Sequence, residues 1–425
     1  MTRGKALQDN FQGAIKSKST RSQTIHHKEQ GNLKNTKHQF ALLRGNAVAS
    51  LIAPLAVLCL CFIPFSSAAA QNPNVGPGKV VVHTEFGGFI LGYDIDRAGT
   101  EGLLAESHNG AGGKFDVAVE TFDQATGKIV KVVTQQTNTN NDFVTFGVFG
   151  NSVGLVEEEI SDGQFVNKRV YGTMNPLSGN KFTGKWTPPF TKDDIVSIMP
   201  FSQGSPTEAV LYFDDFVSFT PSVIETNVAA NTFGTPISIP DTTNFNVAPA
   251  MAYDSQTNQA VLGGSEGCFG CTTEIGIVDL TTGAFTEFEG LGFGFVNGIA
   301  VDPATGIAVT ATEDDASLEF YDVAKQTGTL VVLQGAQGCL GCSQAMSGED
   351  IEFDPIHKLF LVAQPVSSTS PTGSSIQVYD EQGNFVESVN GLNMPISGSM
   401  VLQPSKRAGY ALVTPSLTEL QSFTY

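Results

Sequence analysis

The sequence predicts an all-β fold built as a β-propeller, and three observations carry this prediction. A phrase of short apolar strands separated by an aspartate and a turn occurs three times in the back half of the chain, with aligned aspartates at Asp254, Asp302 and Asp354. These aspartates are 48 and 52 residues apart, a length typical of one blade of four short strands. No stretch after residue 70 combines a helical period with helical length. We therefore expect seven blades, with six or eight as alternatives.

The first 70 residues are expected to lie outside this fold. Residues 1–46 are polar and basic, residues 47–65 are apolar, and three alanines at 68–70 precede Gln71. This order indicates a secretory signal peptide followed by export, to the periplasm or the medium. An uncleaved membrane anchor is the alternative, although the apolar segment contains two prolines and just falls short of the roughly 20 residues of a spanning helix. We expect residues 71–78 to form a linker and residues 79–425 to form one propeller domain.

Apolar segments and the turns between them assign the strands in order. The first three blades are expected at residues 89–96, 101–106, 115–122 and 129–134, then 143–149, 153–158, 165–171 and 181–186, then 195–200, 209–213, 217–228 and 233–239. The next three blades are the copies of the repeat, with outer strands at 285–288, 329–333 and 385–389. Only three strands follow, at 399–402, 409–413 and 417–424. The strand at 79–85 is expected to complete this last blade and close the ring, so that neither chain end is left as an unpaired edge.

The charge of the chain limits its partners. The whole chain has a net charge of −19, and residues 1–70 carry nine Lys and Arg against two Asp and Glu. The remainder therefore has 14 basic and 40 acidic residues, a net charge of −26. Such a surface repels nucleic acid and anionic membranes and attracts cations. We expect a soluble monomer that binds an unidentified small molecule or protein at the mouth of the propeller channel, with no nucleic-acid or membrane partner.

Polar residues precede several expected inner strands, where propellers commonly bind ligands. Asn297 precedes one such strand, and Glu349 and Asp350 precede the next. Inner strands of adjacent blades converge at the channel, so these oxygen ligands are candidates for one hard cation, with calcium as the one candidate cofactor. The alternative is that such side chains cap turns through the neighbouring backbone. His108, in a glycine-rich loop, is the histidine expected to face the same mouth.

Four cysteines of the expected mature chain lie in two similar motifs. The pairs are Cys268 with Cys271 and Cys339 with Cys342. An even number of cysteines in an exported chain indicates local disulfides. A Cys₄ zinc site and a redox dithiol are the alternatives. No histidine follows either motif, which excludes c-type haem attachment.

The segment 295–306, which contains the step Asn297-Gly298-Ile299, resembles the repeat of the NHL, YVTN and gluconolactonase-type propellers. The resemblance covers roughly residues 247–390 as repeats and implies a propeller fold. In lactonase-type members an asparagine at the position of Asn297 binds a divalent ion. The early Glu-Gly-Pro step and the late acid–base aspartate of those enzymes have no recognisable match in this chain.

These observations favour a binding function over catalysis. The function expected is that of an exported, acidic β-propeller that binds a ligand or a protein. A metal-assisted hydrolase or lactonase, with Asn297, Glu349 and Asp350 as metal ligands, is the second hypothesis. A periplasmic redox protein that uses a dithiol is the third. Neither a Gly-x-Ser-x-Gly elbow nor a Walker-type phosphate loop is present, and no catalytic residue is assigned.

Overall fold

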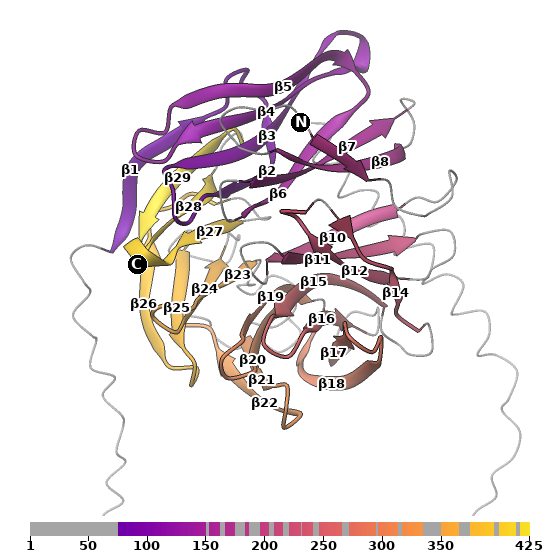
Figure 1. Ribbon diagram of the computed structural model, residues 1–425. Coiled ribbons are helices and arrows are strands. Elements are labelled where there is room, and N and C mark those ends of the chain that lie inside the picture. Colours follow the sequence, from indigo (N-terminus) through magenta and orange to yellow (C-terminus); the bar gives the residue numbers. More distant parts are fainter. Residues whose placement is uncertain are drawn as a thin grey trace, which may run out of the picture. The chain divides into compact units, whose positions relative to one another are not determined.

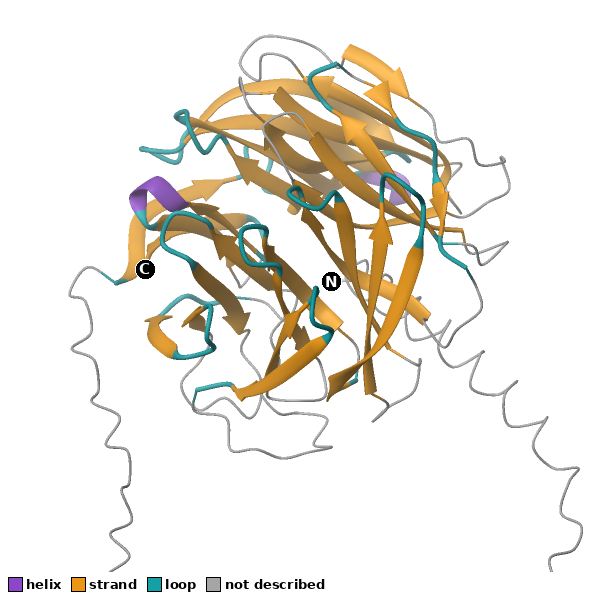
Figure 2. Cartoon of the chain, turned by 60° about the horizontal axis from the view of Figure 1, so that its bottom comes forward, coloured by secondary structure: helices purple, strands orange, loops and turns teal. Residues whose placement is uncertain are grey.

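Short apolar strands separated by turns fold into seven antiparallel sheets, arranged as the blades of a ring (Figures 1 and 2). The computed structural model describes residues 75–149, 153–161, 166–174, 183–186, 196–203, 208–215, 221–230, 232–240, 246–265, 272–294, 296–312, 317–334, 350–364, 375–394, 399–413 and 417–425. All of them belong to the compact unit Ala68–Tyr425, whereas the unit Met1–Ser67 lies outside the described residues, as does the expected signal peptide. The prediction of a seven-bladed all-β propeller is confirmed.

Each blade runs from an inner strand at the ring axis to an outer strand at the rim. The first three blades are β2 (Phe89–Ile95), β3 (Glu101–Asn109), β4 (Phe115–Asp123) and β5 (Ile129–Thr139); β6 (Asp142–Phe149), β7 (Val153–Ser161), β8 (Val166–Met174) and β9 (Thr183–Trp186); and β10 (Val196–Gln203), β11 (Glu208–Asp215), β12 (Ser222–Asn227), β13 (Thr232–Phe233) and β14 (Ile237–Ser238). The next three are β15 (Asn246–Asp254), β16 (Gln259–Ser265), β17 (Thr272–Asp279) and β18 (Phe285–Phe293); β19 (Val296–Asp302), β20 (Ile307–Thr312), β21 (Ser317–Asp322) and β22 (Thr327–Val332); and β23 (Asp350–Asp354), β24 (Leu359–Gln364), β25 (Ser375–Asp380) and β26 (Phe385–Asn390). The seventh is β27 (Met400–Gln403), β28 (Ala408–Val413), β29 (Glu419–Thr424) and β1 (Gly76–His83).

The ring closes because each blade packs against two neighbours. Every one of seven apolar clusters draws its buried residues from two successive blades, including the pair formed by the last blade and the first. In the cluster between these two blades, Leu104 and Phe122 of the first blade meet Tyr410 and Leu420 of the seventh. Inner strands of successive blades also contact one another all the way round, from β2 through β27 and back. Burial on both faces explains why a middle strand such as β24 is apolar up to its last residue, Gln364.

The N-terminal strand β1 completes the seventh blade, as expected. It pairs antiparallel with β29, with Val82 opposite Leu420 and His83 opposite Glu419. The strand begins at Gly76, earlier than the expected 79, so part of the segment assigned as a linker is paired backbone. A register shift between Pro77 and Val81 accommodates this glycine- and proline-containing start.

The third blade differs most from the expected one. A single outer strand at 233–239 was expected, whereas two-residue strands β13 and β14 both pair with β12. Gly234 and Pro236 separate them, and these residues interrupt strands because glycine adds backbone freedom and proline lacks an N–H donor. Strands β3 and β5 in turn extend beyond their expected ends, to Asn109 and Thr139.

The aspartates of the repeat have a structural role. Asp254, Asp302 and Asp354 end three inner strands and are at most 1% exposed. In each, Oδ1 accepts a hydrogen bond from the backbone N–H two residues later, at 2.8–3.0 Å. This is the turn in which an Asp side chain satisfies the backbone that follows it. The repeated aspartate is therefore the cap of a hairpin turn.

Helices are nearly absent from the described residues. The two that occur are the 3₁₀ turns η1 (Ala111–Gly113) and η2 (Pro404–Lys406). None of the helices in this part of the chain has the length and apolarity needed to cross a membrane.

Candidate functional site

Two of the three expected metal ligands lie on neighbouring inner strands whose backbones touch. Asn297 is on β19 and Asp350 begins β23, whereas Glu349 lies outside the described residues. A Cβ atom added to Gly298 would lie 3.0 Å from the Cα of Asp350 and 3.0 Å from the nitrogen of Ile351. A side chain at Gly298 would therefore push the two strands apart. The sequence correctly placed Asn297 and Asp350 at one seam between blades.

The Asp350 carboxylate already has a partner in the seventh blade. Its Oδ2 accepts a hydrogen bond from the backbone N–H of Met400 at 2.8 Å, which ties β23 to β27. Protein atoms surround the carboxyl even though part of the side chain reaches solvent, and this burial raises its pKa to about 6. Within the described residues, no three His, Cys, Asp or Glu side chains are grouped so that they could hold a metal ion. The calcium site stays a prediction, and it depends on Glu349.

A second acidic residue of β23, Glu352, was not singled out from the sequence. Burial is the main cause that raises its pKa to about 8, the charges of Asp350 and Asp94 add to the effect, and Arg97 opposes it. Glu352 is therefore mostly protonated at neutral pH. A protonated carboxyl can donate one hydrogen bond and accept others, which a carboxylate cannot do.

Asp94 and Arg97 bring opposite charges to the same region from the first blade. Asp94 is 4% exposed, and its Oδ2 accepts a hydrogen bond from the backbone N–H of Val148 at 2.6 Å. The Arg97 Nη1 atom lies 3.4 Å from the same oxygen. Burial raises the pKa of Asp94, and Arg97 is the strongest of the contacts that lower it. Burial disfavours the charge of Arg97, yet Asp94 and Glu352 raise its pKa overall.

We call Asp94, Arg97, Asp350 and Glu352 the inner-strand cluster. Asp94 is on β2 and Arg97 lies two residues after the end of that strand, whereas Asp350 and Glu352 are on β23. In the ring, β27 separates β2 from β23 and contacts both. The cluster therefore combines three carboxyl groups and one guanidinium beside the ring axis, at the place where the first and last blades meet.

The sequence contained one signal for this cluster. Glu352 stands between Ile351 and Phe353, so it is a charged residue flanked by apolar ones at the centre of an inner strand. A charged group in such a strand needs a partner or a shifted pKa. The partner could not be identified from the sequence, because Arg97 is more than 250 positions away and reaches Glu352 only through closure of the ring.

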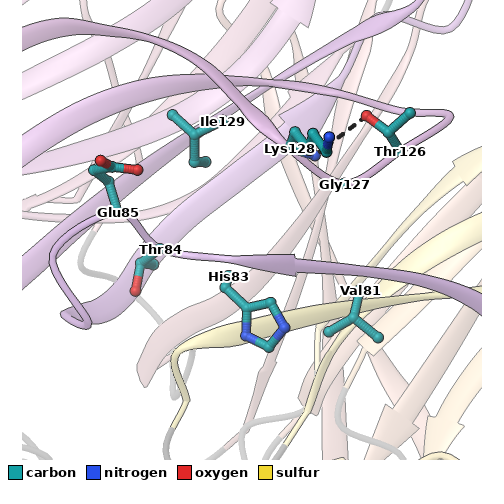
Figure 3. Close-up of a pocket in the computed structure, with 8 residues that line it drawn as sticks. All are labelled: Val81, His83, Thr84, Glu85, Thr126, Gly127, Lys128 and Ile129. Carbon is teal, nitrogen blue, oxygen red and sulfur yellow. Dashed lines mark hydrogen bonds between the residues drawn. The ribbon is translucent and has the colours of Figure 1, made fainter.

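A groove of about 490 Å³ lies elsewhere, beside the closing strand (Figure 3). It is lined by Val81, His83, Thr84, Glu85, Thr126, Gly127, Lys128 and Ile129. The imidazole of His83 is engaged with Glu419, with an Nδ1–Oε1 distance of 3.2 Å. The groove has no residue in common with the inner-strand cluster, so the two are separate features of the surface.

The remaining candidates from the sequence do not form a recognised catalytic arrangement in the described residues. His108 is exposed on β3. His357 approaches the turn-capping Asp354, with Nδ1 at 2.7 Å from Oδ2, and the Tyr425 hydroxyl donates to the same oxygen at 2.8 Å. Cys268, Cys271, Cys339 and Cys342 all lie outside the described residues, so their pairing stays a prediction.

Comparisons with known proteins agree on the fold. No family model matches the chain, and no curated protein matches it. The structure of U3-55K superposes with a TM-score of 0.58 at 12% identity, covering 82% of this chain and 100% of that chain. A chain of the mitotic checkpoint complex crystal structure superposes with a TM-score of 0.52 at 12% identity, covering 92% of this chain and 99% of that chain. The Dos1 propeller superposes with a TM-score of 0.53 at 10% identity, covering 82% of this chain and 95% of that chain. At these identities the likeness shows the propeller fold alone.

Proposed function

We propose that this chain is an exported β-propeller that binds a ligand or a protein partner at its inner-strand cluster, without catalysis. Propellers typically serve as binding or scaffold modules, and the same fold carries many unrelated functions, so the proposal must rest on residues. The observation that carries it is that β27 contacts both β2 and β23 where the ring closes, so that the charges of Arg97 and Asp94 act on the carboxyl of Glu352. Buried ionisable groups with shifted pKa values are enriched at functional sites.

The chemistry of the cluster suggests the class of ligand. A protonated Glu352 and Arg97 supply donors, and the carboxylates supply acceptors. Three carboxyl groups against one guanidinium favour a polar ligand that is neutral or positively charged. A cationic ligand would also favour the charged form of Glu352, because an opposite charge lowers the pKa of a carboxyl. Binding of such a ligand should therefore release a proton near neutral pH.

A thermal-shift comparison tests this proposal. Purified protein is heated with amines, amino acids, sugars and lactones, and the same panel is applied to Glu352→Gln. We expect at least one polar class to raise the midpoint of the wild type by several degrees, since a ligand stabilises the state that binds it. Glu419→Gln changes a carboxyl on β29, outside the cluster, and serves as the matched control. If the ligand still raises the midpoint of Glu352→Gln but no longer raises that of Glu419→Gln, the ligand binds outside the inner-strand cluster.

Export is part of the proposal, and it rests on the order of the basic, apolar and small residues before Gln71. Expression of the full chain in a secreting host, followed by intact mass measurement of the extracytoplasmic protein, tests it. A mature chain that begins at or near Gln71 supports cleavage. A protein that remains in the membrane fraction at full mass supports the anchor instead.

Calcium binding at Asn297, Glu349 and Asp350 is the second candidate, and the close approach of Gly298 to Asp350 favours it. The resemblance of residues 295–306 to lactonase-type propellers implies the same ion. The test is the thermal midpoint with calcium against chelator, in the wild type and in a double variant, Glu349→Ala with Asp350→Ala. The variant loses the bond to Met400, so only its response to calcium is informative. If the wild-type midpoint does not respond, a metal-dependent lactonase is excluded as well.

A further inference from the structure

The outer strands of the blades present open edges, and most of these edges carry features that prevent pairing with another strand. Charged side chains, prolines and register shifts have this effect. Five outer strands carry charged side chains: Lys131 on β5, Lys185 on β9, Glu287 and Glu289 on β18, Glu387 on β26, and Lys79 on β1. Each of the five also pairs with its neighbour through a register shift. The outer strands of the third blade have two residues each, too few to act as a template.

The outer strand of the fifth blade, β22, has none of these features. Its sequence, Thr327–Val332, contains no charged residue and no proline. All its residues pair with β21 in one unbroken register, from Thr327 opposite Asp322 to Val332 opposite Ser317. Among the outer strands that the structure describes, it is the only one longer than two residues that lacks a charge. A regular, uncharged edge is a template for addition of a further strand.

Exposed apolar side chains accompany this edge. Leu330 is 40% exposed and Val332 is 58% exposed, and Leu291 of the neighbouring strand β18 is 45% exposed. Gly328, Leu330 and Val332 share one face of β22, because side chains alternate along a strand. A Cβ atom added to Gly328 would lie 2.6 Å from Oε1 of the buried Glu319 and 3.1 Å from Cδ1 of Leu291, so both side chains cover the glycine on this face. We call Leu291, Leu330 and Val332 the edge patch.

We propose that β22 pairs antiparallel with β22 of a second copy of this chain, across a two-fold axis. A two-fold axis perpendicular to the joined sheet places residues of the same face opposite one another. Leu330 can then face the partner's Leu330, and Val332 can face the partner's Gly328. Because Leu291 covers Gly328, Val332 would also meet the partner's Leu291. The same patch is thus used on both copies, as a two-fold interface requires.

The lack of charged residues on β22 makes this edge better suited to a second copy than the other described edges longer than two residues. Self-pairing brings each charged residue of a strand close to the same charge on the partner, and like charges across strands are unfavourable. Every other described outer strand longer than two residues would meet this repulsion. The expected mature chain has a net charge of −26, and β22 is the described edge of that length where two strands can pair without placing like charges opposite each other.

The predicted association is weak and depends on salt. Six residues span about 20 Å of strand, which cannot bury the roughly 1,200–2,000 Å² of a stable interface. We therefore expect a weak, transient dimer, with a dissociation constant well above that of a stable complex. The net charges of the two copies repel each other at long range, and salt screens this repulsion. The dimer should therefore strengthen when salt is raised, in contrast to an association held by ion pairs.

Sedimentation velocity of the mature protein, over a concentration series on both sides of the expected dissociation constant, tests the proposal. We expect Leu330→Lys to weaken the dimer at least tenfold. Thr329→Lys places a charge on the same strand without removing an apolar contact, and it should have a similar effect. Val130→Lys is the matched control, because Val130 is 53% exposed on the outer strand β5 beside Lys131. This control should dimerise as the wild type does.

Hydrogen exchange locates the interface independently of the variants. The backbone of residues 327–332 should become more protected as protein concentration rises, while that of the outer strand β26 stays unchanged. Thermal midpoints confirm that the lysine variants fold. A wild type that stays monomeric at millimolar concentration overturns the proposal. So does a dimer that resists both Leu330→Lys and Thr329→Lys, or that Val130→Lys weakens equally.

Discussion

Glu106 and Glu120, on the adjacent strands β3 and β4, together accept three backbone N–H groups from the loop between β1 and β2. Glu106 accepts from Phe86 at 3.1 Å and from Gly88 at 2.9 Å, and Glu120 accepts from Glu85 at 3.2 Å. Both carboxyls are at most 1% exposed. Two carboxyl groups of the first blade thus bind the loop that follows β1, and β1 is the strand that completes the seventh blade.

Burial holds Glu120 in its protonated form at neutral pH, and this predicts a pH-dependent stability. Burial, then the charge of Glu106 and a hydrogen bond to it, raise the pKa of Glu120 to about 8. A carboxyl whose folded pKa exceeds its unfolded value stabilises the fold below the unfolded value, and this contribution is lost as pH rises. The loss should extend from about pH 4.5 to about pH 8.

Glu120→Gln should remove this dependence, because an amide keeps the hydrogen-bonding capacity of a neutral carboxyl without a titrating proton. We expect similar free energies of unfolding for wild type and variant near pH 5. Near pH 9 the variant should be the more stable by about 4 kcal/mol. Urea titrations at both pH values measure the difference, with Glu419→Gln as the control. Parallel pH profiles of wild type and Glu120→Gln would show that Glu120 does not titrate over this pH range in the folded protein.

The contact of Gly127 with the closing strand predicts a second effect on stability. Gly127 has φ +71°, and a Cβ atom there would lie 2.3 Å from the carbonyl oxygen of Val81 on β1. Gly306 has φ +72° and nothing within 4 Å of an added Cβ, which makes it a matched control. Gly306→Ala should cost about 1 kcal/mol from the left-handed backbone alone.

Gly127→Ala should cost about 2 kcal/mol more than Gly306→Ala, because the turn or β1 must move as well. Thermal or urea unfolding of both variants measures the difference. Equal losses would show that β1 tolerates displacement, and that the turn after β4 does not support closure of the ring.

Export predicts disulfides between the paired cysteines. We expect Cys268 bonded to Cys271 and Cys339 bonded to Cys342 in protein isolated from an oxidising compartment, since thiols persist mainly in reducing ones. Thiol alkylation before and after reduction, followed by peptide mass spectrometry, reads the pairing directly. Alkylation of all four residues without reduction, or peptides cross-linked between the two motifs, would favour a dithiol or a zinc site.

The architecture was predictable from the sequence because it depends on local, repeated signals. The aspartates at 254, 302 and 354 mark the turns after three inner strands, and short apolar segments mark the strands themselves. The third blade was less predictable, since the glycine and proline between β13 and β14 divide a segment whose pattern suggested one strand.

The inner-strand cluster was not predictable to the same degree. Its members Arg97 and Glu352 come from opposite ends of the chain and meet only because the ring closes. No local pattern in the sequence indicates which residues ring closure will bring together. Asn297 and Asp350 were brought to one seam as expected, because adjacent blades follow each other in sequence and their inner strands must be neighbours.

Calorimetric titration most directly tests whether the inner-strand cluster binds a ligand without transforming it. The best stabiliser from the thermal panel is titrated near neutral pH in two buffers of different ionisation enthalpy, with wild type, Glu352→Gln and Glu419→Gln. For a cationic ligand we predict proton release from wild type and Glu419→Gln, none from Glu352→Gln, and recovery of the compound unchanged. Consumption of the compound by the wild type, or equal proton release from Glu352→Gln, would contradict binding without catalysis at this cluster.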